Sequence, residues 1–197
     1  MHIAPDWQQK TDEELASLTL KHQDAFAILI QRYEARLLRY IRSISNVCVE
    51  DAEDILQEAF IKAYQHLNDF DAKQKFSPWI YRIVRNESIS AFRKKHVRPE
   101  GHGDSIDDTL IEHLTSTIQT SEHAEAQERK KAIHGILASI DPKYREVLAL
   151  KYLDDKAYTE MAYILQKPMG TIATLLNRAK KQFEIAAKQQ GIDLHML

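Results

Sequence analysis

Charged side chains in this chain are sorted into blocks of opposite sign, and each block suggests a different binding chemistry. Residues 50–71 hold seven acids and one base, Lys62, whereas residues 75–98 hold seven bases and one acid, Glu87. Carboxylates gathered on one surface suit a basic protein partner, while lysine and arginine side chains suit phosphate groups. A second basic block at 167–188 holds five bases and a single acid. The net charge of −2 therefore hides two segments that could each meet nucleic acid.

Hydrophobic spacing predicts that helices carry the charged blocks of the first half. Thr11 and Glu14 have the spacing of a capping box that opens a short helix. Asp24 is expected to cap a longer second helix, whose apolar residues recur at helical spacing up to Ile44. A third helix is expected to begin near Glu50. Its predicted buried face consists of Ala52, Ile55, Leu56, Ala59, Phe60, Ala63 and Leu67.

A loop at about 68–75 is expected to separate this acidic helix from a basic one. Ser77-Pro78 predicts the start of the fourth helix, because proline suits the first helical turn. The fourth helix ends in the basic run RKKHVR, where cations suit the negative end of the helix dipole. The acidic and basic blocks are thus predicted on consecutive helices.

The chain is predicted to be all-α, with two helical domains joined by a flexible acidic linker. Only five glycines and five prolines occur, which favours long helices. Residues 98–125 are rich in Pro, Gly, Ser, Thr and Asp and lack a sustained apolar stripe, as is typical of a linker. We therefore expect domains at 1–97 and 126–197. In the second domain, Asp141-Pro142 is expected to cap a helix.

Residues 158–181 have the pattern of a helix-turn-helix. Thr159 and Thr171 are expected to cap its two helices, with Pro168 interrupting the chain between them. Gln166 occupies the turn position that often holds glycine, and a left-handed residue there costs roughly 1–2 kcal/mol. The alternative to a DNA-reading motif is a plain helical hairpin within a bundle. The side chains expected to face inward from the first helix are Met161, Ile164 and Leu165.

The outward face of the second of these helices is predicted to read DNA. A helix placed this way fits the major groove, with its first turns near base edges and its basic side chains near phosphates. Ala173 and Leu175 cannot make the arginine contact to guanine, so readout is expected to lean on Thr174, Asn177 and DNA shape. The exposed face comprises Ala173, Thr174, Asn177, Arg178 and Lys181.

Composition disfavours several other classes of protein. Cys48 is the single cysteine, which excludes an internal disulfide or a cysteine-based zinc site, and it is expected to be a small buried apolar residue. The N-terminus lacks a signal-peptide pattern, and no apolar run reaches the roughly 18 residues of a membrane span, so we expect a soluble cytoplasmic protein without membrane insertion. Phosphate-loop, nucleophile-elbow, zinc-deaminase and Glu-x-x-His patterns do not occur, so we expect no enzyme activity, metal or cofactor.

The order of these segments resembles that of an extracytoplasmic-function (group IV) RNA polymerase sigma factor. In such a protein, the first helical domain binds the −10 promoter element and helps to melt it, and a helix-turn-helix domain binds the −35 element. Five strings in register, three before the linker and two after it, carry the resemblance. They are AFAILIQRYEARLLRYI, EDAEDILQEAFIKAYQHLNDFD, FSPWIYRIVRNESISAFRKK, and YREVLALKYLDDKAYTEMAYIL with GTIATLLNRAKK.

The resemblance implies that the acidic helix docks on core RNA polymerase, at the clamp helices of its largest subunit. The flap of the second subunit would receive the helix-turn-helix domain. A merely solvated acidic face is the alternative interpretation. The contacting residues implied are Asp51, Asp54, Gln57 and Glu58.

The resemblance also places single- and double-stranded promoter DNA on the loop at 68–75 and on the basic helix. Extracting a base costs a few kcal/mol, which stacking and pocket hydrogen bonds offset. Phe70 and Phe76 could supply stacking, although either could be a core residue, and Trp79 is as compatible with a core anchor as with a DNA contact. The residues implied are Asn68, Phe70, Lys75, Trp79, Arg82, Arg85, Asn86, Arg93 and Lys94.

Departures from the family pattern bear on which promoter is read. Ser90 stands where the family usually has Asp, and Ala173 and Leu175 replace the usual Lys and Arg of the recognition helix. Arg145 and Lys151 match family positions near DNA phosphates. The residues implied for the −35 element are therefore Arg145, Lys151, Thr171, Ala173, Thr174, Asn177, Arg178 and Lys181.

Two further questions stay open at the level of sequence. The linker would thread near the polymerase active-site cleft, where its seven carboxylates could imitate nucleic acid, or it could be an inert tether. An anti-sigma factor is an expected partner. The rival function is a helix-turn-helix transcriptional regulator with an N-terminal helical interaction domain, which would not explain the paired acidic and basic helices.

Overall fold

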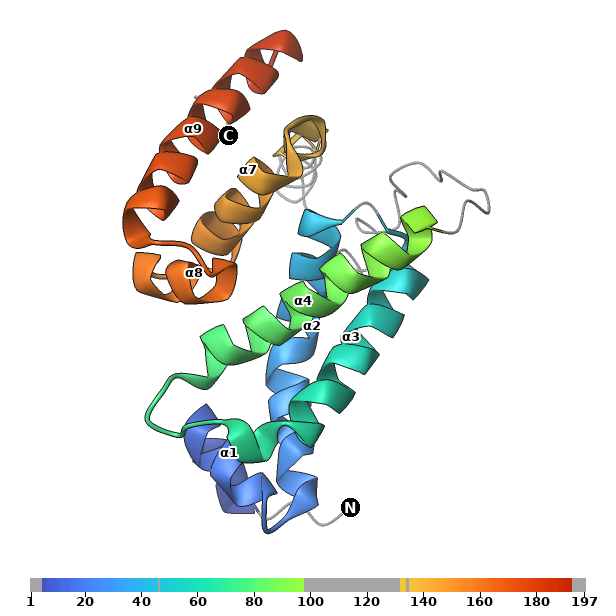
Figure 1. Ribbon diagram of the computed structural model, residues 1–197, viewed down its shortest axis with the longest axis vertical. Helices are drawn as coiled ribbons and strands as arrows, with labels where there is room; N and C mark the ends of the chain where they lie inside the picture. The colour runs from blue at the N-terminus through green and yellow to red at the C-terminus, as the bar shows by residue number, and fades with distance from the viewer. Residues whose placement is uncertain (1–4, 46, 98–131, 134, 193–197) are drawn as a thin grey trace, which may run out of the picture.

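The computed structural model describes residues 5–45, 47–97, 132–133 and 135–192. Within these ranges the chain is built of helices and turns without strands, as predicted. The expected linker at 98–125 lies outside the described residues. Figure 1 shows two helical parts, an N-terminal domain containing α1–α4 and a C-terminal domain containing α7–α9.

The N-terminal domain is a helical bundle in which α2, α3 and α4 pack against one another. The predicted buried face of α3 is confirmed from Ala52 to Ala63, and Leu67, in the 3-10 turn after the helix, is buried as expected. On α2, Tyr40 and Ile28 are buried as well, which widens the stripe predicted from the sequence. The helices are α1 (Asp12–Thr19), α2 (Phe26–Ile44), α3 (Val49–Gln65) and α4 (Phe76–Val97), with 3-10 turns at Pro5–Gln9, Gln23–Ala25 and Leu67–Asp69.

Helix starts in this domain agree with the sequence in part. The capping box is confirmed, because the Thr11 hydroxyl accepts the Glu14 N–H at 3.2 Å and the Glu14 carboxylate accepts the Thr11 N–H at 2.7 Å. The expected cap at Asp24 is wrong: Asp24 lies within a 3-10 turn, and α2 begins after Ala25 without a side-chain cap. Helix α4 begins at Phe76, one residue before the predicted Ser-Pro start.

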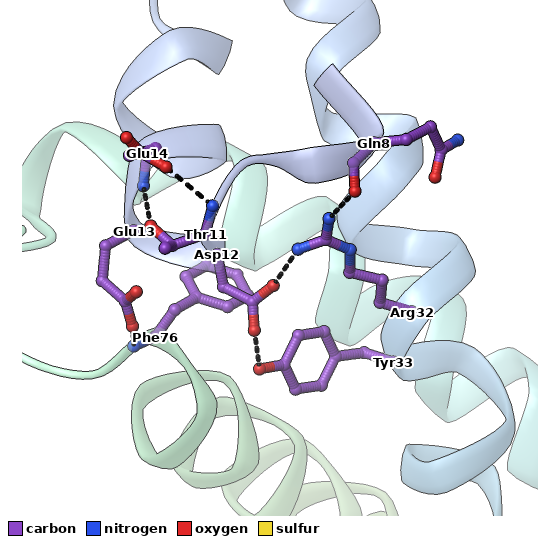
Figure 2. A network of polar contacts seen from close by, with 8 residues as sticks. All are labelled: Gln8, Thr11, Asp12, Glu13, Glu14, Arg32, Tyr33 and Phe76. Atoms are coloured by element: carbon purple, nitrogen blue, oxygen red, sulfur yellow. Dashed lines mark hydrogen bonds and ion pairs between the residues drawn. The ribbon is translucent and has the colours of Figure 1, made fainter. Parts of the chain in front are cut away.

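Helix α1 fastens the N-terminal end of α4 to α2 (Figure 2). The Asp12 carboxylate accepts hydrogen bonds from Arg32, at 2.6 Å, and from the Tyr33 hydroxyl. The neighbouring Glu13 carboxylate accepts the Phe76 N–H at 2.9 Å, which satisfies a free donor in the first turn of α4. Burial raises the pKa of Tyr33, and the hydrogen bond to Asp12 raises it further. This network holds the start of the basic helix in place.

The C-terminal domain packs its apolar side chains between α7, α8 and α9. The inward positions predicted for α8 are confirmed, and on α9 Leu176 is buried whereas Leu175 is half-buried. Asp141 caps α7 as predicted, since its carboxylate accepts the Lys143 N–H at 2.9 Å. The elements are α7 (Pro142–Leu148), a π-helical segment (Ala149–Leu153), α8 (Tyr158–Leu165) and α9 (Met169–Gln189).

The predicted caps of the helix-turn-helix are wrong. Helix α8 begins after Ala157, whose N–H is accepted by the Glu160 carboxylate at 2.9 Å, so Thr159 already lies inside the helix. Helix α9 begins after Pro168, two residues before Thr171. Proline needs no hydrogen-bond partner for its nitrogen, which lets the chain enter the helix earlier than the threonine would suggest.

Gln166 adopts the left-handed conformation predicted from the sequence, with φ 52° and ψ 47° at the end of α8. Gln166→Gly should therefore raise the free energy of unfolding by about 0.5–1 kcal/mol. Relief of left-handed strain, about 1–2 kcal/mol, outweighs the entropic cost of glycine, about 0.5–1 kcal/mol. Urea denaturation followed by circular dichroism measures the difference.

A matched control is the same substitution in the exposed middle of α9. Gln182→Gly should lower the free energy of unfolding by about 1 kcal/mol, because glycine is a poor helix former. A similar loss at Gln166 would show that its backbone is not strained.

Candidate nucleic-acid interface

The acidic block lies on the exposed side of α3. Asp54, Gln57 and Glu58 are exposed, and Asp51 is half-buried. The same exposed face continues into two large apolar side chains, Ile61 at 46% exposure and Tyr64 at 39%. Apolar anchors beside charged groups are typical of protein interfaces. Sequence reasoning missed these two residues, although their helical spacing from the acids was the available signal.

An ion pair joins α3 to α4. It pairs the lone base of the acidic block with the lone acid of the basic block. The Lys62 amine, from the acidic block, lies 2.6 Å from the Glu87 carboxylate, from the basic block. Glu87 is mostly buried, with 17% of its side chain exposed. Asp54 and Glu58 take no part in this ion pair, and both are exposed on α3.

A cavity of about 330 Å³ lies between α3, the turn that follows it and α4. Lysine and arginine side chains line it with hydrogen-bond donors, and carboxylates line it with acceptors. Trp79 and Ile83 add apolar surface. This volume is at the lower end of the range for small-ligand sites, about 300–1,000 Å³. The lining residues are Lys62, His66, Asp69, Trp79, Arg82, Ile83, Asn86 and Glu87.

Aromatic residues beside this cavity belong mainly to the core. Phe76 is 1% exposed and Trp79 is 7% exposed, with their ring centres 5.4 Å apart. Half-buried Phe70 packs against both rings. Of the two alternatives left open for Phe76, its enclosed ring supports the core residue and not the stacking platform. Trp79 is a core residue that also contributes to the cavity wall.

Three basic side chains predicted to hold DNA, Lys75, Arg82 and Arg85, form a surface that we call the basic face. Each contacts the C-terminal domain. Their contacts are Lys75 to Glu160 at 3.1 Å, Arg85 to Glu146 at 2.7 Å, and Arg82 over the Tyr163 ring at 4.4 Å. Burial lowers the pKa of Arg85, but the hydrogen bond and charge of Glu146 outweigh burial and raise it above its ordinary value. Arg93, Lys94 and Asn68 are exposed.

Further buried polar groups lie between the domains. The Tyr40 hydroxyl donates to Glu146 at 3.0 Å. Lys156, only 7% exposed, donates to the Ser77 hydroxyl at 2.6 Å and lies 4.1 Å from the centre of the Tyr81 ring. Burial lowers the pKa of the Lys156 amine. Sequence reasoning missed Glu146 and Lys156, because no local pattern indicates contacts between domains.

The exposed face of α9 carries the side chains predicted for the −35 element. Thr171, Asn177, Arg178 and Lys181 are exposed and Ala173 is half-buried. The Thr174 hydroxyl donates to the Gly170 carbonyl at 2.9 Å within the first turn. Small side chains at the start of the helix and cations farther along it leave room for close approach to a duplex.

Arg145 on α7 and Lys151 in the π-helical segment after it were expected to contact DNA phosphates, but both side chains already contact groups within the C-terminal domain. Arg145 is 5% exposed and donates to the carbonyls of Ala138 and Ile140, at 3.0 and 3.2 Å. We therefore correct its role from phosphate contact to support of the preceding turn. Lys151 is half-buried, with its amine 3.6 Å from the Asp155 carboxylate.

Three other expectations concern membrane-spanning helices, metal sites and Cys48. Among the described residues, no helix has the length and apolar character needed to cross a bilayer. Within the same ranges, no group of three or more His, Cys, Asp or Glu side chains is arranged to hold a metal ion. Cys48 is half-buried in the residue position just before α3, so the expectation of a buried cysteine is wrong.

Comparisons with known proteins agree with this arrangement. Sigma-70 region 2 matches residues 29–98, and the region 4 family matches residues 130–183. The ECF RNA polymerase sigma factor SigW of Bacillus subtilis (strain 168) is 35% identical over 81% of this chain and 87% of its own length. This chain belongs to the ECF family of RNA polymerase sigma factors. It directs RNA polymerase to promoters.

Other relatives of the sigma factor cover nearly its whole length. The ECF RNA polymerase sigma-E factor of Escherichia coli (strain K12) is 28% identical over 90% of this chain and 94% of its own. CnrH, solved in complex with the cytosolic domain of CnrY, is 20% identical, with a TM-score of 0.65 over 91% of this chain and 99% of its own. RpoE of Bartonella quintana, solved with the anti-sigma factor NepR, is 23% identical, with a TM-score of 0.62 over 83% and 96%. At these identities the solved structures indicate a shared fold.

Proposed function

We propose that this sigma factor binds core polymerase through α3 and promoter DNA through α4, the neighbouring cavity and α9. The observation that most supports this proposal is the division of charge within one bundle. Asp54 and Glu58 are exposed on α3, whereas Arg82 and Arg85 project from α4 toward the C-terminal domain. Two surfaces of opposite sign suit two different partners, a basic protein and a polyanion.

The exposed face of α3 is suited to the clamp helices of the largest polymerase subunit. Asp54, Gln57 and Glu58 provide charge that speeds encounter with a basic partner. Ile61 and Tyr64 add apolar area that becomes buried on docking. The C-terminal domain would meet the flap of the second subunit, which places α9 beside the −35 duplex.

The cavity beside α4 is suited to a base flipped from the −10 nontemplate strand. Asn86 and Arg82 can donate to base oxygens and nitrogens, and Glu87 can accept from an exocyclic amine. Removing a base from the stack costs a few kcal/mol, and such contacts offset that cost. Exposed Arg93 and Lys94, farther along α4, would bind the phosphates of the opened strand.

Arg178 on α9 is proposed to contact one phosphate of the −35 duplex. Arg178→Ala should weaken holoenzyme binding to a −35 fragment and lower the slope of log affinity against log salt by about one unit. Fluorescence anisotropy at several salt concentrations measures the slope. Lys188→Ala, at the distal end of the same helix, is the matched control and should leave it unchanged. An unaltered slope for the Arg178 variant would rule out the proposed contact between Arg178 and a phosphate.

The remaining assignments concern organisation and partners. We propose domains at 1–97 and 126–197, separated by a linker at 98–125 that runs near the polymerase cleft. The protein acts as a non-catalytic initiation factor in the cytoplasm, where polymerase works. An anti-sigma factor is proposed as a further partner, since two proteins of the same fold were solved with partner proteins, one of them an anti-sigma factor.

Transcription in vitro with purified core polymerase tests the proposed function. With genomic DNA of the source organism as template, adding the sigma factor should produce transcripts that begin at defined sites, while core polymerase alone should not. Mapped starts should share elements near −10 and −35. Tight binding to duplex DNA without polymerase, and no defined starts with it, would instead favour an ordinary helix-turn-helix regulator.

A further inference from the structure

One carboxylate in the wall of the cavity beside α4 is held by a partner on the neighbouring helix. The Lys62 amine of α3 donates to the Glu87 carboxylate of α4 at 2.6 Å, and both residues line the cavity. The hydrogen bond falls on one carboxylate oxygen, Oε2, while Oε1 accepts no hydrogen bond from a described residue. Only 17% of the Glu87 side chain is exposed, so water screens the pair incompletely. One charged acceptor oxygen of Glu87 is therefore left for a ligand.

The second carboxylate of the cavity is a weaker selector of ligands. Asp69 pairs with His66 at 3.1 Å, and 76% of its side chain is exposed. Hydrogen bonds to such an exposed group compete with water, and exposed ion pairs contribute little. Glu87 is therefore the acceptor that distinguishes between ligands, and Asn86 beside it supplies an amide donor.

The four DNA bases present different donors and acceptors to this pair of side chains. Cytosine and adenine each carry one exocyclic amine next to an unprotonated ring nitrogen. The amine can donate to Glu87 while the ring nitrogen accepts from Asn86. Thymine carries a carbonyl oxygen on each side of its ring N–H, and a carboxylate repels these oxygens. Guanine carries a ring N–H beside its exocyclic amine, and these two donors together suit both oxygens of a free carboxylate.

We infer that the cavity accepts cytosine or adenine in preference to guanine and thymine, and that Lys62 is the positioning residue that excludes guanine. By occupying Oε2, the Lys62 amine leaves Glu87 a single acceptor oxygen. One of the two neighbouring donors of guanine would then be buried without a partner, which is costly. This inference rests on the proposed function, which places a base of the nontemplate strand in the cavity.

Binding of holoenzyme to pre-melted promoters measures the base preference. Each promoter has an unpaired −10 element and carries one of the four bases at the nontemplate position that crosslinks to benzoylphenylalanine placed at Asn86. Because the strand is already unpaired, changing the base does not alter the cost of melting. The parent chain should bind the cytosine and adenine promoters about tenfold more tightly than the guanine and thymine promoters. Equal binding of all four, or a preference for guanine or thymine, would overturn the inference.

Lys62→Met should shift the preference toward guanine. With both oxygens of Glu87 free, the affinity for guanine relative to cytosine should rise about tenfold, while thymine should stay weak. Lys62→Arg keeps a cation on the carboxylate and should still exclude guanine. Lys21→Met, at an exposed position before α2, makes the same change in net charge and is the matched control. An unchanged ratio of guanine to cytosine in folded Lys62→Met, or an equal change in Lys21→Met, would contradict the role of Lys62.

Glu87→Gln tests the acceptor itself. A glutamine amide can turn either its oxygen or its nitrogen toward the base, so discrimination between cytosine and thymine should fall below about threefold. Full discrimination against thymine in this variant, with the fold checked by circular dichroism, would show that Glu87 does not select the base.

The crosslink separates this inference from the proposed function. If the Asn86 probe joins a base and the parent holoenzyme does not distinguish the four bases at that position, only the inference is overturned. If the probe joins no base of the nontemplate strand, the placement of DNA in the cavity is itself wrong, and the inference is overturned with it.

Discussion

A chain carrying Asp54→Lys and Glu58→Lys should bind core RNA polymerase at least about a hundredfold more weakly than the parent chain. Both side chains are exposed on α3, so the substitutions leave the buried side of the helix intact. On the proposed surface, attraction to a basic partner becomes repulsion, and like charges brought together cost several kcal/mol. Biolayer interferometry with immobilised core polymerase measures the affinity, and circular dichroism checks the helical fold.

The matched control reverses two acids that lie elsewhere on the surface. Glu34→Lys with Glu184→Lys makes the same change in net charge at exposed positions of α2 and α9. This control should retain affinity near that of the parent. Equal loss in both double variants would mean that only bulk charge matters, and unchanged binding of the α3 variant would remove α3 as the docking surface.

Trp79→Ala should lower the free energy of unfolding by about 3–5 kcal/mol. Trp79 is 7% exposed and its ring contacts both Phe70 and Phe76, so truncation leaves a cavity inside the bundle. Urea denaturation of the full chain measures the loss. The large effect is expected because the aromatic cluster joins the start of α4 to the loop before it.

A second substitution separates packing from DNA binding at this position. Trp79→Phe keeps an aromatic ring in the cluster and should recover most of the lost stability. Its holoenzyme should then open promoters nearly as well as the parent. A stability loss below about 1 kcal/mol for Trp79→Ala would contradict the core assignment and return Trp79 to the DNA contacts.

Helical periodicity was sufficient to predict the buried side of α3. Every residue from Ala52 to Leu67 that was expected to be buried is buried. The pattern is reliable there because one side of α3 faces α2 and α4 while the other faces solvent. The left-handed Gln166 was likewise predictable, since the turn between two fixed helices dictates its backbone conformation.

Contacts between segments far apart in the chain could not be predicted from the sequence. Arg85 looked like a free phosphate ligand, and nothing near it in the chain indicated Glu146 as its partner. Arg145 looked basic and therefore exposed, but its guanidinium satisfies carbonyls in the core. Charge patterns describe one element at a time, whereas these pairings depend on how elements are placed in space.

One signal in the sequence was available and unused. Lys62 is the lone base of the acidic block and Glu87 is the lone acid of the basic block, and the two form an ion pair beside the cavity. A charge opposite to that of its surroundings suggests a partner on the neighbouring helix. Caps were less predictable, because Ala157 and Pro168 precede helices without a capping side-chain oxygen of their own.

Photo-crosslinking in a polymerase–promoter complex tests the division of labour between α3 and α4 most directly. Benzoylphenylalanine is placed at Gln57 on α3 or at Asn86 on α4, both of which are exposed. We predict that the Gln57 probe joins the largest polymerase subunit and that the Asn86 probe joins the nontemplate strand. If the Gln57 probe crosslinks only to DNA, or the Asn86 probe only to polymerase, the proposed division of roles between α3 and α4 is contradicted.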